Sequence, residues 1–191
     1  NALGGISGIR VFDQGNRFLS VTDKGNWFTG SIERDNYGKI VGIRSARIAP
    51  LRDHKGKPFT SKKYGDAEGM EIIGDRVLVS FERKSRILKY RLDLKDFATS
   101  GKNFRKAIRK FKLPNNSGLE AISILAPPSD SGLAKTDIVV ISENSLDANG
   151  NIRGFISKKN KWKEFSVRKK DGYNITDATL LPSGDLIILE R

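Results

Sequence analysis

The chain has 191 residues and a formal net charge of +13, from 35 Lys and Arg against 22 Asp and Glu. This length suits one domain or part of a larger one. The absence of cysteine excludes disulfides, thiolate metal sites and cysteine nucleophiles, and no apolar run is long enough to span a membrane as a helix. The positive charge is concentrated in residues 52–63, 83–112 and 153–170, and the remaining sequence is net acidic.

Four hairpins are predicted along the chain. The second strand of each hairpin is a short apolar run that ends in an acidic residue, at residues 18–23, 77–82, 138–143 and 186–190. The first strands lie upstream, at residues 7–11, 68–73, 119–124 and 176–181. Glycine followed by Asn or Asp, as in Gly15-Asn16 and Gly74-Asp75, favours a tight turn between the two strands.

Further strands are predicted between the hairpins, at residues 27–32, 39–48, 87–92, 154–157 and 162–167. Hairpins that recur every 50 to 60 residues favour an all-β fold, a β-propeller of four-stranded blades with about three to four blades visible. A β-sandwich of ordinary hairpins is the alternative. Propellers have about four to eight blades, so we expect residues 1–191 to form a single, incomplete domain, a fragment of a larger propeller.

A basic helical insertion is predicted at about residues 94–113. Phe104, Ala107, Ile108 and Phe111 have the i, i+3, i+4, i+7 spacing of an amphipathic helix, with Lys and Arg on the opposite face. The helix could be an ordinary surface helix with a solvated face, or it could dock on a membrane or a polyanion.

Acidic residues recur at corresponding places in the hairpins. In a propeller the first strand of each blade lines the central channel, so these carboxylates would meet there. Carboxylates gathered in one funnel repel each other, and a hard cation such as Ca²⁺, which takes six to eight oxygen ligands, would neutralise them. The candidate metal ligands are Asp23, Glu82, Glu143 and Glu190 at the ends of the hairpins, and Glu68, Glu120 and Asp177 at their openings.

The same residues allow two other interpretations. Some of the acids could be structural, capping turns or pairing with arginines, and a pair of carboxylates could act without a metal. Glu68, Glu82 and Asp177 are the candidate catalytic residues. The basic residues that follow three of the acids, namely Lys24, Arg83 and Arg191, are candidates for binding an anionic substrate.

Several enzyme classes lack support in the sequence. The only histidine, His54, lies in a polar, turn-like stretch and is more typical of a surface residue than of a catalytic base. The sequence contains neither the Gly-x-Ser-x-Gly turn of an α/β-hydrolase nor a Walker A phosphate-binding loop.

The chain resembles a known family over residues 4–191. The resemblance rests on strings that recur in this order: GGISG at 4–8, VTDKG at 21–25, DAEGM at 66–70, SFER at 80–83, GLEAI at 118–122, TDA at 176–178 and LER at 189–191. They are similar to the phytase-like family with esterase-like activity, a bacterial and largely exported β-propeller group. The resemblance implies a propeller, a periplasmic or secreted location and hydrolysis of ester or phosphate-ester bonds. In the related alkaline phytases, carboxylates hold calcium and the substrate phosphate.

Two functions are therefore compared. The first is a metal-dependent hydrolase of phosphate esters or esters, with an anionic small molecule as substrate. The second is a non-catalytic propeller that binds an acidic envelope component or protein through its basic segments. Nucleic acid is a weaker candidate partner, because no reading motif accompanies the basic segments.

Overall fold

A computed structural model of the chain describes residues 3–104, 106–114, 117–125, 137–158 and 161–191. Its strands form four antiparallel sheets, and the described residues contain only two short helices. Sheets 1, 2 and 3 have four strands each, and sheet 4 has two. The predicted all-β class is therefore confirmed.

Within each sheet the strands lie side by side in chain order. Sheet 1 contains β1 (Ile6–Phe12), β2 (Arg17–Thr22), β3 (Asn26–Arg34) and β4 (Ile40–Pro50). Sheet 2 contains β5 (Ala67–Ile73), β6 (Arg76–Phe81), β7 (Arg86–Arg91) and β8 (Lys102–Phe104). Sheet 3 contains β9 (Leu119–Ile124), β10 (Ile138–Leu146), β11 (Ile152–Lys158) and β12 (Lys161–Val167), and sheet 4 contains β13 (Ile175–Leu180) and β14 (Leu186–Glu190). The helices are α1 (Lys62–Gly65) and the 3-10 helix η1 (Lys106–Phe111).

The four predicted hairpins are all present, as β1–β2, β5–β6, β9–β10 and β13–β14. Gly15, Gly74 and Gly184 have positive φ angles of 86°, 56° and 92°, which explains why glycine is needed in these turns.

The predicted helical insertion at residues 94–113 is wrong in its first part. The structure has the short strand β8 there, which pairs with β7, followed by η1. Phe104 and Ile108 are both buried as the helical pattern predicted, but a strand followed by a 3-10 turn buries the same residues. Pairing with β8 also satisfies backbone groups of β7 that would otherwise lie at the sheet edge.

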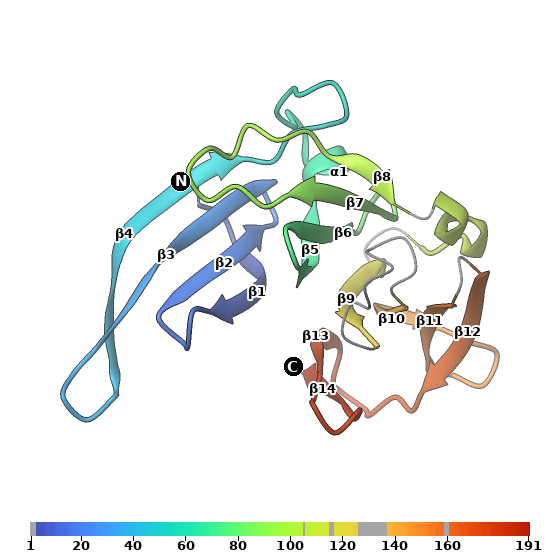
Figure 1. Ribbon diagram of the computed structural model, residues 1–191. Coiled ribbons are helices and arrows are strands. Elements are labelled where there is room, and N and C mark those ends of the chain that lie inside the picture. The colour runs from blue at the N-terminus through green and yellow to red at the C-terminus, as the bar shows by residue number, and fades with distance from the viewer. Residues whose placement is uncertain (1–2, 105, 115–116, 126–136, 159–160) are drawn as a thin grey trace.

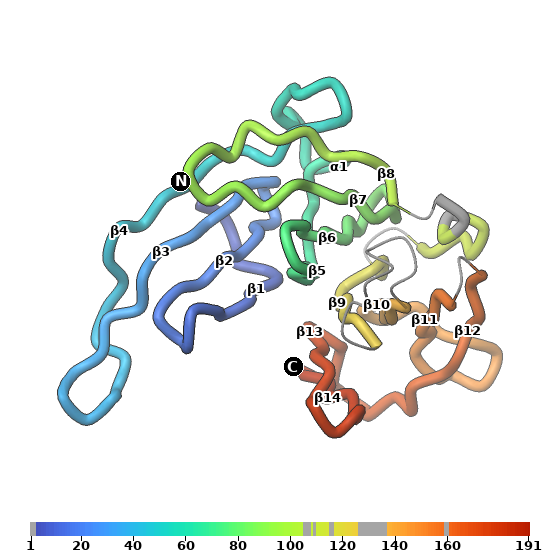
Figure 2. The backbone as a smooth tube through the Cα atoms, in the orientation of Figure 1, coloured from blue at the N-terminus to red at the C-terminus, as the bar shows by residue number. Residues whose placement is uncertain are grey.

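The sheets are arranged around their first strands. β1 contacts β5, β5 contacts β9, and β9 contacts β13. From these four inner strands the sheets extend outward, so that the described residues form an arc with sheet 1 at one end and sheet 4 at the other (Figures 1 and 2). The basic segments 83–112 and 153–170 include the outer strands β7, β8, β11 and β12, together with the β6–β7 turn, η1 and the residues that follow β12.

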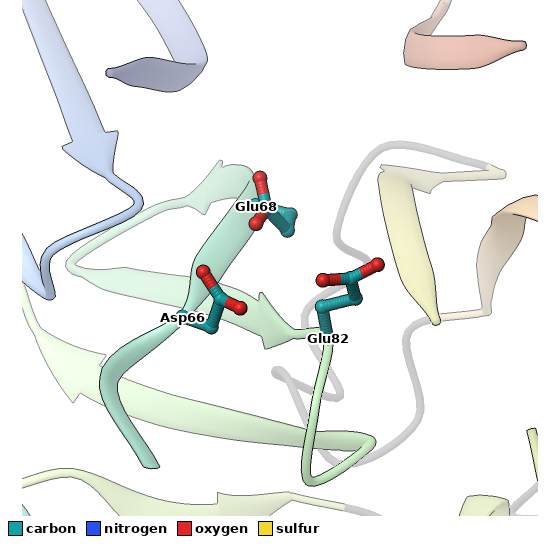
Figure 3. A group of neighbouring side chains, drawn as sticks. All are labelled: Asp66, Glu68 and Glu82. Atoms are coloured by element: carbon teal, nitrogen blue, oxygen red, sulfur yellow. The ribbon is translucent and has the colours of Figure 1, made fainter. Parts of the chain in front are cut away.

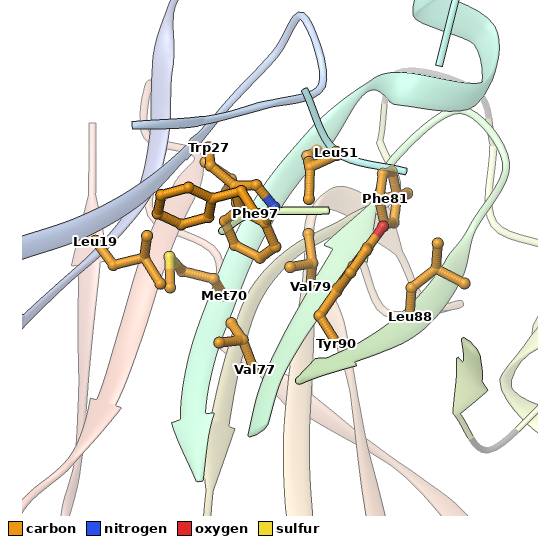
Figure 4. Packing of buried hydrophobic residues seen from close by; sticks show 12 residues of the cluster. Leu19, Trp27, Leu51, Met70, Val77, Val79, Phe81, Leu88, Tyr90 and Phe97 are labelled. Carbon is orange, nitrogen blue, oxygen red and sulfur yellow. The ribbon is translucent and has the colours of Figure 1, made fainter. Parts of the chain in front are cut away.

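A separate hydrophobic cluster fills each space between neighbouring sheets. Between sheets 1 and 2, Trp27 packs edge-on against Tyr90 with ring centroids 5.1 Å apart, and Leu19 and Met70 lie in the same cluster (Figure 4). Leu78 and Phe155 belong to the cluster between sheets 2 and 3. A smaller cluster joins sheets 3 and 4. Burial of each large apolar side chain contributes about 1.5–3 kcal/mol, so packing between sheets is the main stabilising contribution.

The inner strands approach each other very closely. A Cβ atom added to Gly8 would lie 2.7 Å from the carbonyl oxygen of Glu68 and from the amide nitrogen of Met70. A Cβ atom on Gly69 would meet the carbonyl oxygen of Glu120 at a still shorter distance. Glycine is therefore required at these two positions because the next strand leaves no room for a side chain.

Arg10 links the four inner strands. From β1 its guanidinium group reaches Asp177 on β13 at 2.8 Å, the carbonyl oxygen of Ile122 on β9 at 3.0 Å and Glu71 on β5 at 3.4 Å. A further hydrogen bond of 3.0 Å goes to the carbonyl oxygen of Ala178. The Arg10 side chain is only 13% exposed, so its charge is largely removed from water and depends on these partners.

Neither helix in the part of the chain that the structure describes has the length and apolar character needed to cross a membrane.

We predict that Gly69→Ala destabilises the fold by about 1–3 kcal/mol or more, because the new methyl group would overlap the backbone of β9. The free energy of unfolding from urea titration measures the effect. Gly5→Ala is the matched control, since its Cβ atom would lie 3.5 Å from Asp23, an ordinary contact. Equal stability of the two variants would show that the strands can separate without cost.

We predict that Arg10→Ala costs about 3–5 kcal/mol, because it leaves the carboxylates of Glu71 and Asp177 partly buried without their cation. Arg76→Ala is the control: its partner Asp75 is 68% exposed, and such a surface pair contributes at most about 1 kcal/mol. A loss below about 1 kcal/mol in Arg10→Ala would contradict the linking role.

Candidate functional site

Each inner strand contains one extra residue near its start. In β1 the register changes between Ile6 and Ile9, and in β5 between Ala67 and Met70. β9 and β13 change register at the corresponding places, after Leu119 and after Ile175. Such bulges bend a strand and redirect side chains. Glu68 and Glu120 lie in the bulges of β5 and β9, at the same end of neighbouring strands.

The ends of the second strands define a set of equivalent positions. The backbone N–H groups of Asp23, Glu82 and Glu143 donate to the carbonyl oxygens of Gly5, Asp66 and Gly118, each at 3.0 Å. In sheet 4 the equivalent hydrogen bond, of 2.9 Å, joins Arg191 to Asn174. The predicted equivalence of Asp23, Glu82 and Glu143 is therefore confirmed.

The predicted equivalence of Glu190 is wrong by one residue. Glu190 pairs with Ile175 inside β14, and Arg191 occupies the position held by acids in the other sheets. A slip of one residue turns a side chain to the opposite face of a strand. The carboxylate of Glu190 instead lies 3.3 Å from Lys170.

The same slip removes Asp177 from the position of Glu68 and Glu120, which Thr176 takes. Asp177 corresponds to the close-packed Gly8 and Gly69. Its two oxygens accept hydrogen bonds of 2.8 and 3.3 Å from Arg10. The structure therefore places the carboxylate of Asp177 in the contact that links the inner strands, and not with Glu68 and Glu82.

Three carboxylates come together where β5 begins and β6 ends. Asp66 immediately precedes β5, Glu68 lies in its bulge, and Glu82 immediately follows β6 (Figure 3). One oxygen atom from each lies within 4.8 Å of the others. The pairing of Ala67 with Phe81 brings them together, because it places the flanking acids side by side. We call Asp66, Glu68 and Glu82 the carboxylate triad.

Asp66 is the most deeply buried member of the triad, with 1% of its side chain exposed. Its Oδ2 lies 2.8 Å from Arg83 Nε, and its Oδ1 lies 3.5 Å from Lys62 Nζ. None of the described residues makes a hydrogen bond to Oδ1. A buried acceptor without a hydrogen bond costs about 1–3 kcal/mol, and the ammonium group of Lys62 offsets part of this cost.

Burial and mutual repulsion disfavour ionisation of the neighbouring glutamates. Burial, and then the charges of Asp66 and Glu82, raise the pKa of Glu68 to about 8, although a hydrogen bond from Ser7 opposes this change. Burial, followed by the charges of Glu68, Glu143 and Glu82, raises the pKa of Glu120 to about 9. The pKa of Glu82 is also raised, by burial and then by Asp66.

The other predicted site residues surround the triad or lie apart from it. Asp23 is joined to Asp66 through Lys62, whose Nζ lies 3.3 Å from Asp23 Oδ2. Glu143 accepts a hydrogen bond of 3.3 Å from Asn174 and contributes negative charge near Glu82 and Glu120. The positive charge of Arg191 opposes the raised pKa of Glu120. Lys24 is exposed next to Asp23.

Sequence reasoning did not select Asp66 as a candidate ligand. The other sheets have Gly5, Gly118 and Asn174 at the equivalent position, so the repeat gave no indication of an acid there. Its spacing from Glu68 was the available signal, because residues i and i+2 of an extended segment point to the same side.

The sheets are packed around their inner strands, and carboxylates are crowded at one end of these strands. This geometry is consistent with the family that the sequence comparison identifies. The model of the phytase-like family, described as the esterase-like activity of phytase, matches residues 1–191. The chain belongs to this family. A search of the curated proteins finds no match.

We predict that the metal-free protein loses stability as the pH rises from about 5 to 9. Glu68 and Glu120 keep their protons in the folded state up to pKa values of about 8 and 9, but they ionise near 4.5 when unfolded. Between these limits the unfolded state binds fewer protons than the folded state, so increasing pH favours unfolding.

Glu120→Gln cannot ionise, so it should reduce this slope and be about 1–3 kcal/mol more stable than the wild type at pH 9. Urea titrations at several pH values measure it. Glu33→Gln is the control, because the Glu33 side chain is 40% exposed and pairs with Arg44, which is itself 71% exposed. A slope in Glu120→Gln as steep as that of the wild type would contradict the interpretation.

Proposed function

We propose that the protein is a metal-dependent hydrolase of phosphate esters, and that the carboxylate triad holds the metal. The observation that carries this proposal is the triad itself: one carboxylate oxygen from each of Asp66, Glu68 and Glu82 lies within 4.8 Å of the others. In addition, Asp66 Oδ1 is buried and accepts no hydrogen bond from the described residues. Membership of the phytase-like family supports the reaction class, since the family is described by the esterase-like activity of phytase.

The donor set fits a hard cation, and we propose Ca²⁺. All three side chains offer carboxylate oxygens, which calcium prefers, and the chain has no cysteine that would favour a softer metal. The pKa values of Glu68 and Glu82 are raised by burial and then by neighbouring carboxylates, and a cation between the carboxylates would favour their ionised forms. When bound, such an ion would polarise a phosphoryl oxygen and acidify a water molecule.

The remaining residues suit the binding of an anionic small molecule. Arg83 and Arg191 bring positive charge to the carboxylates, and exposed Lys24 adds charge beside Asp23. Glu120 lies outside the triad, and its pKa of about 9 leaves it protonated at neutral pH, so it can donate a proton to a leaving oxygen. The sequence-based assignment of Glu68 and Glu82 to catalysis stays a prediction. We expect a periplasmic or secreted location from the family resemblance.

The propeller is also part of the proposal. The arc of sheets around four inner strands is the arrangement that blades have in a propeller. Its two ends carry exposed apolar side chains, Ile9 and Val11 on β1 and Ile187 and Leu189 on β14. These are surfaces on which a further blade would pack, as sheets 1–4 pack on each other.

A non-catalytic binding function is the second candidate. A pocket of about 400 Å³ on the outer strands of sheet 2 is lined by Arg76, Lys89, Arg91 and Lys102. Its charge suits an acidic envelope component or an acidic protein. Binding of such a partner would weaken as salt concentration rises and would not depend on the carboxylate triad.

The test is calcium-dependent release of phosphate from a phosphomonoester such as p-nitrophenyl phosphate. Asp66→Asn should weaken calcium binding by about 10- to 100-fold or more, and reduce kcat/KM with it, because it removes one ligand charge from the triad. Asp75→Asn, which changes an exposed acid, is the control. Unchanged calcium affinity in Asp66→Asn would refute the metal site, and no turnover by the calcium-loaded wild type would refute the hydrolase.

A further inference from the structure

A further pocket lies on the outer part of sheet 2, apart from the carboxylate triad. Its volume is about 430 Å³, and it is lined by the connection between β4 and α1, by Tyr64 of α1 and by residues of β7 and β8. None of the described residues that line it belongs to the triad. A pocket of this size can hold a small organic molecule.

The hydroxyl group of Tyr90 is a buried polar group beside this pocket. Only 1% of Tyr90 is exposed, and none of the described residues forms a hydrogen bond with its hydroxyl oxygen. The tip of the ring lies against Gly101, which lines the pocket: a Cβ atom added to Gly101 would lie 2.6 Å from that oxygen. Because an unpaired buried hydroxyl is costly, a ligand that pairs with it gains more than it would from an exposed one.

The charged groups nearest this hydroxyl also line the pocket. Burial raises the pKa of Tyr90, and the charges of Arg86 and Asp53 act on it in opposite directions. Arg86 and Asp53 are both lining residues, which places the hydroxyl at the same side of the pocket as these two side chains. The hydroxyl is uncharged at neutral pH, so it can donate one hydrogen bond and accept another.

The lining is balanced in charge. Of the described lining residues, Asp53 is the one acid and Arg86 the one Lys or Arg. Hydrogen bonds from the backbone N–H groups of Lys57 and Lys55, at 2.9 and 2.8 Å, lower the pKa of Asp53 and fix its carboxylate. The buried guanidinium group of Arg86 is fixed over the Phe81 ring, 4.0 Å from its centre. The pocket therefore favours neither an anion nor a cation.

Apolar surface and uncharged polar groups complete the lining. Phe59 and Leu88 contribute apolar side chains, and Tyr64, which is 50% exposed, adds an aromatic ring. Thr60 and Asn103 contribute a hydroxyl group and an amide, each of which can donate and accept hydrogen bonds. This combination suits an uncharged ligand that has an apolar face and several hydroxyl groups around its edge.

We propose that this pocket binds an uncharged hexopyranose, and that one sugar hydroxyl pairs with the hydroxyl of Tyr90. The C–H face of the sugar ring would pack on the aromatic side chains. Its hydroxyl groups would donate to the carboxylate of Asp53 and exchange hydrogen bonds with the amide of Asn103. The sugar could be free or the end unit of a glycan, because both present the same ring. This site does not depend on hydrolysis at the triad.

The site is tested by NMR titration of the isotope-labelled full chain with D-glucose, D-galactose and D-mannose, with no metal added. We expect at least one sugar to bind, and Tyr90→Phe and Asn103→Ala each to weaken its binding about 3- to 10-fold, because each removes a hydrogen bond to the ligand. Tyr37→Phe is the matched control, since it removes a hydroxyl from a tyrosine that is 96% exposed. Absence of binding by all three sugars at millimolar concentrations, or equal affinity in Tyr90→Phe and the wild type, would overturn the proposal.

The role of the Tyr90 hydroxyl is also tested without a ligand. Because this hydroxyl has no hydrogen-bond partner among the described residues, Tyr90→Phe should be at least as stable as the wild type in urea titration. Weaker sugar binding in a variant of unchanged stability then reports the contact with the ligand. A loss of stability would show that the hydroxyl already has a partner within the protein, which contradicts the proposal.

The charge of the ligand is tested with the amino sugar and the uronic acid that correspond to the sugar that binds best. Each should bind more weakly than the neutral sugar, because a charged group would lose its hydration without gaining an unpaired counter-charge. Tighter binding of either charged sugar would refute the assignment to an uncharged ligand.

The methyl glycoside of the same sugar distinguishes the two sources. Tighter binding of the glycoside indicates the end unit of a glycan, and tighter binding of the free sugar indicates a monosaccharide. Both results support the proposal. Loss of binding to both in Asn103→Ala and Tyr37→Phe alike would contradict it, since Tyr37 lies outside the pocket lining.

Discussion

The close approach of the inner strands is the constraint on which the rest of the structure depends. Gly8 and Gly69 have no room for a Cβ atom, because the backbone of the next inner strand lies against them. Strands this close bring side chains at neighbouring positions close as well. Glu68 and Glu120 flank these contacts, in the bulges of β5 and β9, and the resulting burial and repulsion raise their pKa values. The crowded carboxylates are thus a consequence of how the sheets pack.

The two arginines near the centre neutralise their carboxylates to different extents. Arg10 has two carboxylates and two further carbonyl oxygens of neighbouring strands as partners, so its end of the inner strands is well satisfied. Arg83 pairs with Asp66 through one nitrogen, while Glu68, Glu82 and Glu120 remain next to one another. Stability alone would favour full compensation at both ends. The crowding of carboxyl groups at the Arg83 end, which raises the pKa values of Glu68 and Glu120, is therefore the feature that a ligand best explains.

The sequence was sufficient to predict the hairpins, because alternation and turn glycines are local signals. It did not predict the register of the fourth hairpin, and this one omission explains two errors. Thr176 and Arg191 hold the positions equivalent to Glu68 and Glu82, so Asp177 and Glu190 leave the positions assigned to them. Asp66 was missed for a different reason, since it has no acidic counterpart in the other sheets. Neither error could be corrected without knowing which backbone groups pair.

The fold shows where the residues that give the net charge of +13 are located. Outer strands carry basic residues such as Lys89, Lys102 and Lys163, whereas Glu68 and Glu120 lie on inner strands, so the two basic segments and the central carboxylates are distinct regions. Charges of opposite sign that are kept apart stabilise the fold less than paired charges would. They create instead two regions of opposite potential, a basic one that attracts anions and an acidic one that attracts cations. Arg83 lies where the two regions meet, because it follows the last residue of the triad and opens the basic segment.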